Sequence, residues 1–184
     1  VGRTYTNPII SDKSVPDPTV IRANDGYFYL YATQTSTYWM PIYRSKDLVN
    51  WEYQKTAFTQ ATKPSLSGGG AFWAPEMTYI NGKYVLYFSW AKMNGADVSY
   101  TAVAVSDSPL GPFPNSKALI TNEEFGSNVI DQFYYEENGK KYMFFGSFKG
   151  IYVTELTDDG LSVKRDVDGK PVLKKQVCGN AFEG

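Results

Sequence analysis

The sequence predicts an all-β fold in which four-stranded antiparallel units lie around a common axis, as in a β-propeller. The main observation is an internal repeat, because three segments share a turn dipeptide followed by an aromatic, strand-forming run: residues 25–31, 81–87 and 138–144. Their aromatic residues Tyr27, Tyr84 and Tyr142 are 57 and 58 residues apart. The composition agrees, since 16% aromatic residues with 16 Gly and 10 Pro favour strands and tight turns. No long stretch has a helical pattern, and a β-sandwich is the alternative architecture.

Each repeat is expected to contain a hairpin and further strands. Asn-Gly or Asp-Gly between apolar runs is the strongest local signal for a hairpin, and each of the three segments starts with one. A second family of segments predicts a third strand that ends in a polar turn: residues 42–48, 103–110 and 151–156. The loops at residues 60–70 and 111–114 do not interrupt the phase of the repeat, so residues 1–184 are expected to form a single domain.

The repeats are spaced by 57 residues, so a chain of 184 residues has room for a little over three of them. A propeller needs at least about four blades to close. We therefore expect an incomplete propeller, which covers about three blades and the start of a fourth. On this interpretation the chain is the N-terminal part of a longer polypeptide.

Composition excludes several classes of function. The chain has 18 basic and 19 acidic side chains and no basic stripe, so it is not expected to bind nucleic acid. No apolar run approaches the roughly 20 residues that a membrane span needs. The first residues lack a signal-peptide core, so an exported protein would already have lost its signal. The absence of histidine and the single cysteine, Cys178, exclude zinc sites and Ser-His-Asp catalysis within this chain. Cys178 is expected to be a small buried hydrophobic residue.

A carboxylate precedes each predicted hairpin, and another lies where the next unit would start. These four acids, with spacings of 59, 55 and 52 residues, are Asp17, Glu76, Asp131 and Glu183. In a propeller the first strand of each blade is innermost, so equivalent positions converge on the central channel. For one acid alone, capping of a turn beside Pro or Gly would be the simpler interpretation. The recurring set instead indicates convergent carboxylates, which without histidine or cysteine point to glycoside hydrolysis.

At these residues the sequence resembles glycoside hydrolase family 43, the five-bladed β-propeller enzymes that act on arabinan, arabinoxylan and related plant polysaccharides. The matching motifs, specific through their order and spacing, are Asn7-Pro8-Ile9-Ile10, Pro16-Asp17-Pro18, residues 45–51, Trp73-Ala74-Pro75-Glu76, residues 106–113, Ile130-Asp131 and Phe182-Glu183-Gly184. The stretch 145–152 is most similar to the arabinanase branch.

The resemblance implies three catalytic residues: Asp17 as general base, Asp131 as the carboxylate that tunes and orients the acid, and Glu183 as general acid. An inverting enzyme needs an ionised carboxylate to activate water and a protonated one, roughly 6.5–9.5 Å away, to protonate the leaving oxygen. A second negative charge near the acid raises its pKa and keeps it protonated. This chain departs from the family pattern at Asp131-Gln132, where Asp-Pro is common.

Some family members carry a channel cation that a histidine of the last blade ligates. Because this chain has no histidine, a channel Ca²⁺ or Na⁺ would need ligands from outside the chain, and no cofactor is assigned.

Three aromatic residues are predicted to bind substrate: Trp73, Phe72 and Phe182. Sugars stack on aromatic faces, and the resemblance places such a Trp beside the sugar. Packing in the core is the alternative for each of them, and it is the first choice for Trp39 and Trp90.

The expected function is inverting cleavage of α-L-arabinofuranosyl linkages in plant cell-wall polysaccharide, first as an endo-α-1,5-L-arabinanase. An exo-acting α-L-arabinofuranosidase or a β-xylosidase is the alternative within the same class. A non-catalytic glycan-binding propeller is the alternative from another class. The protein is expected to be a secreted or periplasmic monomer, with a plant polysaccharide or oligosaccharide as its partner.

Overall fold

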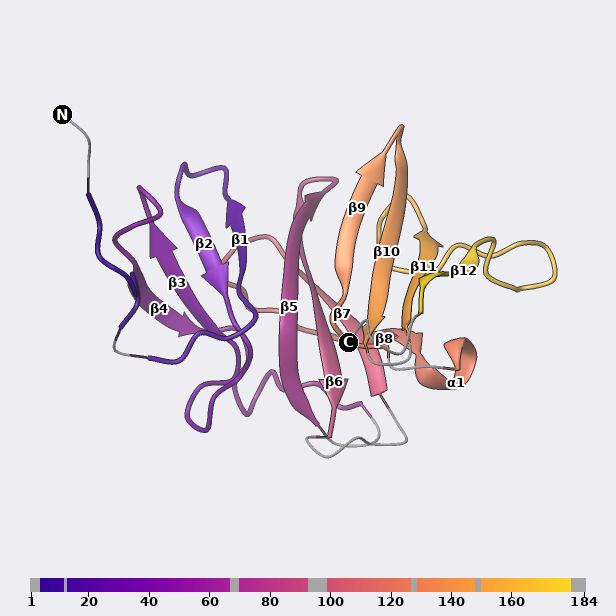
Figure 1. The fold of residues 1–184 in the computed structure, drawn as a ribbon, viewed down its shortest axis with the longest axis horizontal. Helices are drawn as coiled ribbons and strands as arrows, with labels where there is room; N and C mark the ends of the chain where they lie inside the picture. The colour runs from indigo at the N-terminus through magenta and orange to yellow at the C-terminus, as the bar shows by residue number, and fades with distance from the viewer. Residues whose placement is uncertain are drawn as a thin grey trace.

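The structure is a computed structural model that describes residues 4–11, 13–66, 70–92, 99–126, 129–147 and 150–179. It contains three separate four-stranded sheets, each formed by consecutive antiparallel strands (Figure 1). This confirms the predicted all-β fold of four-stranded units. No helix in the described part of the chain is long and apolar enough to cross a membrane.

The strands of each sheet hydrogen bond in chain order. The first sheet consists of β1 (Thr19–Arg22), β2 (Phe28–Tyr31), β3 (Pro41–Ser45) and β4 (Glu52–Thr56). The second consists of β5 (Ala71–Ile80), β6 (Lys83–Ala91), β7 (Ser99–Ser106) and β8 (Lys117–Thr121). The third consists of β9 (Phe133–Glu137), β10 (Lys140–Ser147), β11 (Gly150–Leu156) and β12 (Lys174–Cys178). A short helix, α1 (Asn122–Phe125), follows β8 and is capped by the Thr121 hydroxyl.

The predicted hairpins form at the turn dipeptides. Asn81-Gly82 and Asn138-Gly139 each connect two strands directly, and all four residues have φ between 50° and 81°. Such left-handed pairs match the twist of the strands that they join. The first hairpin is longer, because β1 ends at Arg22 and β2 begins at Phe28.

The first strands of the three sheets lie next to one another. β1 contacts β5 and β5 contacts β9, and the three follow one another across the molecule in Figure 1. This is the order of inner strands that a propeller requires. The residues at their beginnings are therefore brought together from three repeats.

Two hydrophobic clusters hold neighbouring sheets together. The first joins the first two sheets and includes Tyr31, Phe58, Phe72, Phe88 and Trp90. The second joins the second and third sheets and includes Tyr87, Ile120, Phe125, Met143 and Phe145. Seven of the twelve largest fully buried side chains among the described residues are aromatic, which agrees with the 16% aromatic content.

Cys178 differs from the sequence-based expectation, because its side chain is exposed. It ends β12, an edge strand whose five residues are all exposed. No other described strand pairs with the outer edge of β12. The prediction of a buried thiol was wrong because it came from residue type alone.

Candidate active site

Asp17 lies just before β1, with its carboxylate exposed and oriented by a hydroxyl. The Thr33 Oγ1 hydroxyl donates to Asp17 Oδ2 at 2.7 Å. Thr33 follows β2, and its backbone N–H donates to Pro16 O at 3.0 Å, which extends the hairpin pairing to the Asp17 segment. Asp17 has φ of 49°, so the backbone turns at this residue. These contacts hold an accessible carboxylate in one orientation.

Asp131 has the same place in the third sheet. It lies just before β9, is exposed, and has φ of 55°. The Gly146 N–H donates to Ile130 O at 2.9 Å, which repeats the contact of Thr33 with Pro16. The Asp131 N–H donates to Ser89 Oγ of β6 at 3.0 Å. Asp131 is therefore fixed by its own sheet and by the second sheet.

The equivalent residue in the second sheet is Ala74 and not Glu76. Ala74 has φ of 39° and lies 57 residues from both Asp17 and Asp131. Glu76 pairs with Tyr87, as Thr19 pairs with Tyr31. The sequence comparison aligned acids by type, whereas the backbone places Glu76 two residues beyond the position of the aspartates. The predicted series of equivalent carboxylates is thus interrupted at the second sheet.

Glu76 instead connects the three inner strands. Its Oε2 accepts a hydrogen bond from Thr19 Oγ1 at 3.1 Å, and its Oε1 accepts one from Tyr134 N–H at 3.4 Å. Burial raises the pKa of Glu76, and these two hydrogen bonds oppose that rise. The side chain reaches β1 and β9 from β5, which is a structural link that sequence spacing did not reveal.

The charge of Asp17 affects the ionisation of Asp131. The pKa of Asp131 is raised, first by desolvation of its carboxyl and second by the negative charge of Asp17. A raised native pKa means that Asp131 favours the folded state below its unfolded pKa and loses that contribution as pH rises through the native value. The negative charge of Asp17 therefore adds to desolvation in raising the pKa of Asp131.

Replacing Asp17 by Asn is expected to lower the pKa of Asp131, because it removes the second of these two causes. Desolvation remains, so the pKa of Asp131 should stay above the ordinary aspartate value. Carbon-13 NMR titration of the Asp131 carboxyl in both proteins measures the shift. An unchanged pKa would show that the two carboxylates are not coupled.

The predicted substrate-binding aromatics separate into different environments. Phe72 is only 1% exposed, and its ring stacks on Phe58 with centroids 4.6 Å apart. It is therefore a core residue, and its ring is not available to a sugar. Trp73 is half-buried and immediately precedes Ala74, so it remains a candidate beside the aspartates. Phe182, like the predicted acid Glu183, lies outside the described residues.

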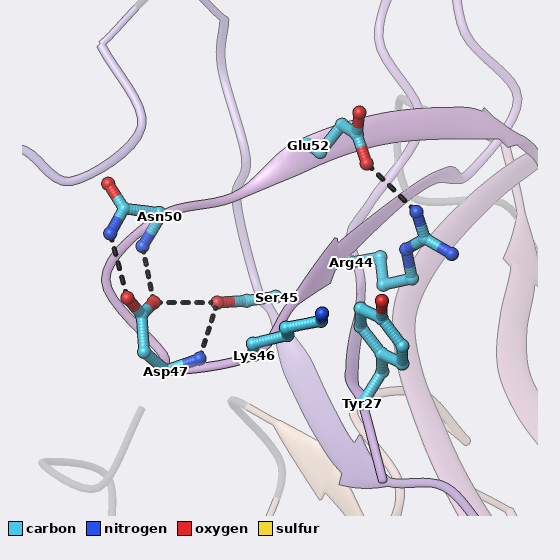
Figure 2. Close-up of a pocket in the computed structure, with 7 residues that line it drawn as sticks. All are labelled: Tyr27, Arg44, Ser45, Lys46, Asp47, Asn50 and Glu52. Carbon is cyan, nitrogen blue, oxygen red and sulfur yellow. Dashed lines mark hydrogen bonds and ion pairs between the residues drawn. The ribbon is translucent and has the colours of Figure 1, made fainter. Parts of the chain in front are cut away.

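The cavity in Figure 2 is separate from the aspartates. It measures about 340 Å³ and is lined by Tyr27, Arg44, Ser45, Lys46, Asp47, Asn50 and Glu52. These residues border the end of β3 and the start of β4, whereas Asp17 precedes β1 and Thr33 follows β2. Because the strands are antiparallel, the cavity and Asp17 lie at opposite ends of the first sheet.

The polar groups that line this cavity hydrogen bond or form ion pairs mainly with neighbouring residues of the same turn. Asp47 accepts hydrogen bonds from the backbone of Asn50 at 2.8 Å and of Val49 at 2.9 Å, and contacts to Asn50 lower its pKa most. Arg44 pairs with Glu52 at 3.0 Å and lies over the Tyr27 ring. The arrangement stabilises the turn between β3 and β4.

The described residues offer no metal centre, because no group of three or more Asp, Glu, His or Cys side chains among them could hold an ion. What they do offer is a pair of carboxylates, Asp17 and Asp131, at equivalent positions before two inner strands. Carboxylates brought together in this way are the groups that glycoside hydrolysis uses.

Curated relatives with related activities match most of this chain. It is 30% identical over 156 residues to extracellular endo-α-(1→5)-L-arabinanase 1 of Bacillus subtilis (strain 168), covering 79% of this chain and 47% of that protein. It is 31% identical over 150 residues to a xylan 1,3-β-xylosidase of a Vibrio species, covering 76% of this chain and 26% of that protein. The chain thus spans half or less of the length of these relatives.

Solved structures and a family model give the same result. An endo-arabinase from Bacteroides thetaiotaomicron VPI-5482 matches with a TM-score of 0.70 and 26% identity, covering 94% of this chain and 60% of that chain. The structural neighbours are five-bladed β-propellers, so the three sheets described above form part of such a propeller. The model of glycosyl hydrolases family 43 matches residues 5–184. The chain belongs to glycosyl hydrolases family 43.

Proposed function

We propose that the protein carrying this chain is an inverting glycoside hydrolase that cleaves α-L-arabinofuranosyl linkages in plant cell-wall polysaccharide, most specifically as an endo-α-1,5-L-arabinanase. The observation that carries this proposal is the pair Asp17 and Asp131, which occupy equivalent positions before two inner strands and are electrostatically coupled. Family membership and the arabinanase relative support the substrate class.

In this mechanism Asp17 is the general base. Its carboxylate, oriented by Thr33, takes a proton from a water molecule whose oxygen attacks the anomeric carbon. Glu183 is the general acid, and it gives its proton to the leaving oxygen as the glycosidic bond breaks. Water enters from the face opposite to the leaving group, so the configuration inverts.

Asp131 acts through charge. A carboxylate close to the general acid raises the pKa of that acid and keeps it protonated until the leaving oxygen needs the proton. The coupling between Asp17 and Asp131 supports this role, because charge at one carboxyl already changes the pKa of the other. Trp73, half-buried next to Ala74, is the proposed sugar-stacking residue.

Two alternatives compete with this proposal. An exo-acting α-L-arabinofuranosidase or a β-xylosidase would use the same carboxylates, and the Vibrio relative is named a xylosidase. A non-catalytic glycan-binding propeller would bind the sugar without turnover. Secretion is proposed because the Bacillus subtilis relative is named extracellular, and the protein is proposed to act as a monomer.

The test is digestion of linear α-1,5-arabinan by the complete polypeptide, with product sizes measured by chromatography. Oligomers are expected from endo cleavage, and monomer alone would favour the exo-acting alternative. Xylo-oligosaccharides in a parallel digest test the xylosidase alternative. Binding of arabinan and xylan without any product would contradict the hydrolase proposal and favour the glycan-binding module.

A further inference from the structure

A line of hydrogen bonds connects the Asp17 carboxylate to the second sheet. The Ala74 N–H donates to Thr33 Oγ1 at 2.7 Å, and the Thr33 hydroxyl donates onward to Asp17 Oδ2 at 2.7 Å. The single hydroxyl therefore accepts from one sheet and donates to the acid of another. Any movement of the Ala74 backbone is transmitted to the hydroxyl that orients Asp17.

The same line continues from Ala74 to Asp131. The Gln132 side-chain Nε2 donates to Ala74 O, and its Oε1 accepts from Ser89 Oγ at 3.0 Å. Ser89 Oγ in turn accepts from the Asp131 N–H at 3.0 Å. Gln132 is thus the side chain that joins the Ala74 backbone to the Ser89 hydroxyl, and through it to Asp131.

The part of this network formed by Ser89 and Gln132 is buried, and its side-chain groups form hydrogen bonds. Ser89 is 0% exposed and Gln132 is 5% exposed. Polar groups removed from water are costly unless they form hydrogen bonds, and a satisfied buried network holds one arrangement of its members. Asp131 is therefore attached directly to the buried pair, and Asp17 is connected to it through Ala74 and the half-buried Thr33.

Thr33 and Ser89 have equivalent roles in the repeat. Thr33 hydrogen bonds to Pro16, which precedes Asp17, and Ser89 pairs with Trp73, which precedes Ala74. Each hydroxyl accepts the backbone N–H at the acid position of the next sheet. Gln132 adds a second contact between the second and third sheets.

We propose that Gln132 is a positioning residue, which holds the Asp131 backbone in register with Ala74 and thereby sets the relative placement of the Asp17 and Asp131 carboxylates. This inference rests on the proposed function for the catalytic roles of the two aspartates. It gives a positioning role to Gln132, which stands where the family commonly has the proline of Asp-Pro. A proline at this position has no amide that could make either contact.

The test uses Gln132→Met in the complete polypeptide, since Met has a similar length but cannot make these hydrogen bonds. Thr154→Val is the control, because Thr154 is likewise buried, at 0% exposed, and its hydroxyl donates to a backbone carbonyl, Leu173 O, at 2.8 Å. That hydrogen bond connects β11 to the segment before β12 and includes neither aspartate. Gln132→Met loses two hydrogen bonds and Thr154→Val loses one, so urea denaturation of both variants measures the stability that each has lost.

The distinguishing measurement is the change in the pKa of Asp131 caused by Asp17→Asn, determined by NMR in each background. We expect Gln132→Met to alter this Asp17-dependent change in the pKa of Asp131. We also expect it to lower kcat between about 10- and 100-fold, with a smaller effect on KM. Thr154→Val should leave both unchanged. An unaltered Asp17-dependent shift in stable Gln132→Met protein would overturn the proposal.

Two further outcomes are distinguishable. If Gln132→Met does not fold, Ser89→Ala is measured in the same way, and an unaltered shift there would equally overturn the proposal. If the unmodified protein hydrolyses neither arabinan nor xylo-oligosaccharides, the proposed function fails. The NMR coupling still decides whether Gln132 positions the two carboxylates.

Discussion

Asp17→Asn is expected to abolish arabinan hydrolysis, with kcat falling by at least about 10²- to 10⁴-fold. Asparagine fills the same space and can still meet the Thr33 hydroxyl, but it cannot take a proton from water. Because the lost interaction belongs to the reaction and not to the bound ground state, affinity for an arabino-oligosaccharide should change little. Product release and calorimetric binding measure the two effects separately.

Asp25→Asn is the matched control for this substitution. Asp25 lies in the first hairpin turn, where it accepts hydrogen bonds from Tyr27 N–H at 3.0 Å and from the Tyr29 hydroxyl at 2.8 Å. It lies between β1 and β2, at the end of the sheet opposite to Asp17. It should retain turnover. Appreciable residual activity in Asp17→Asn would refute the role of Asp17 as general base.

Phe72→Ala is expected to destabilise the fold by about 3–5 kcal/mol. The Phe72 ring is 1% exposed, lies against Phe58 and Phe88 with centroids 4.6 and 5.7 Å away, and meets Trp90 edge-on. Its removal would leave a cavity in the cluster that joins the first two sheets. Urea denaturation of the complete polypeptide measures this loss.

Trp73→Ala, at the adjacent residue, is compared with Phe72→Ala. Trp73 is half-buried and precedes the acid-equivalent residue Ala74, so its loss should weaken binding of arabino-oligosaccharides more than it lowers stability. Phe72→Ala should show the reverse pattern. If Phe72→Ala bound sugar weakly at unchanged stability, the assignment of Phe72 to the core would be wrong.

The repeat was predictable because its signals are local. Asn81-Gly82 and Asn138-Gly139 adopt the left-handed backbone that their residue types favour, and the strands on both sides follow directly. Asp17 and Asp131 could be selected for the same reason, since each directly precedes the first strand of a repeat. The prediction that they matter for catalysis remains open to the experiments above.

For Glu76 and Phe72, the local sequence did not predict the environment that the structure shows. The sequence aligned Glu76 with the aspartates by acid type, but β5 has an irregular register between Trp73 and Glu76, and the backbone makes Ala74 the equivalent residue. Alternation along a strand separates Phe72 from Trp73, but it does not say which face meets the neighbouring sheet. The packing of Phe58 against Phe72 decided that question.

The four-stranded repeat, its turns and the two aspartates at the start of inner strands follow from residues close together in the chain, so they can be predicted from sequence. The contacts of Gln132 with Ala74 and Ser89 span 58 and 43 residues, and they become visible only in the folded protein. The tertiary structure also decided that Glu76 reaches Thr19 and Tyr134 across 57 and 58 residues. Contacts of this kind depend on how whole sheets pack, and no local pattern of residue types encodes them.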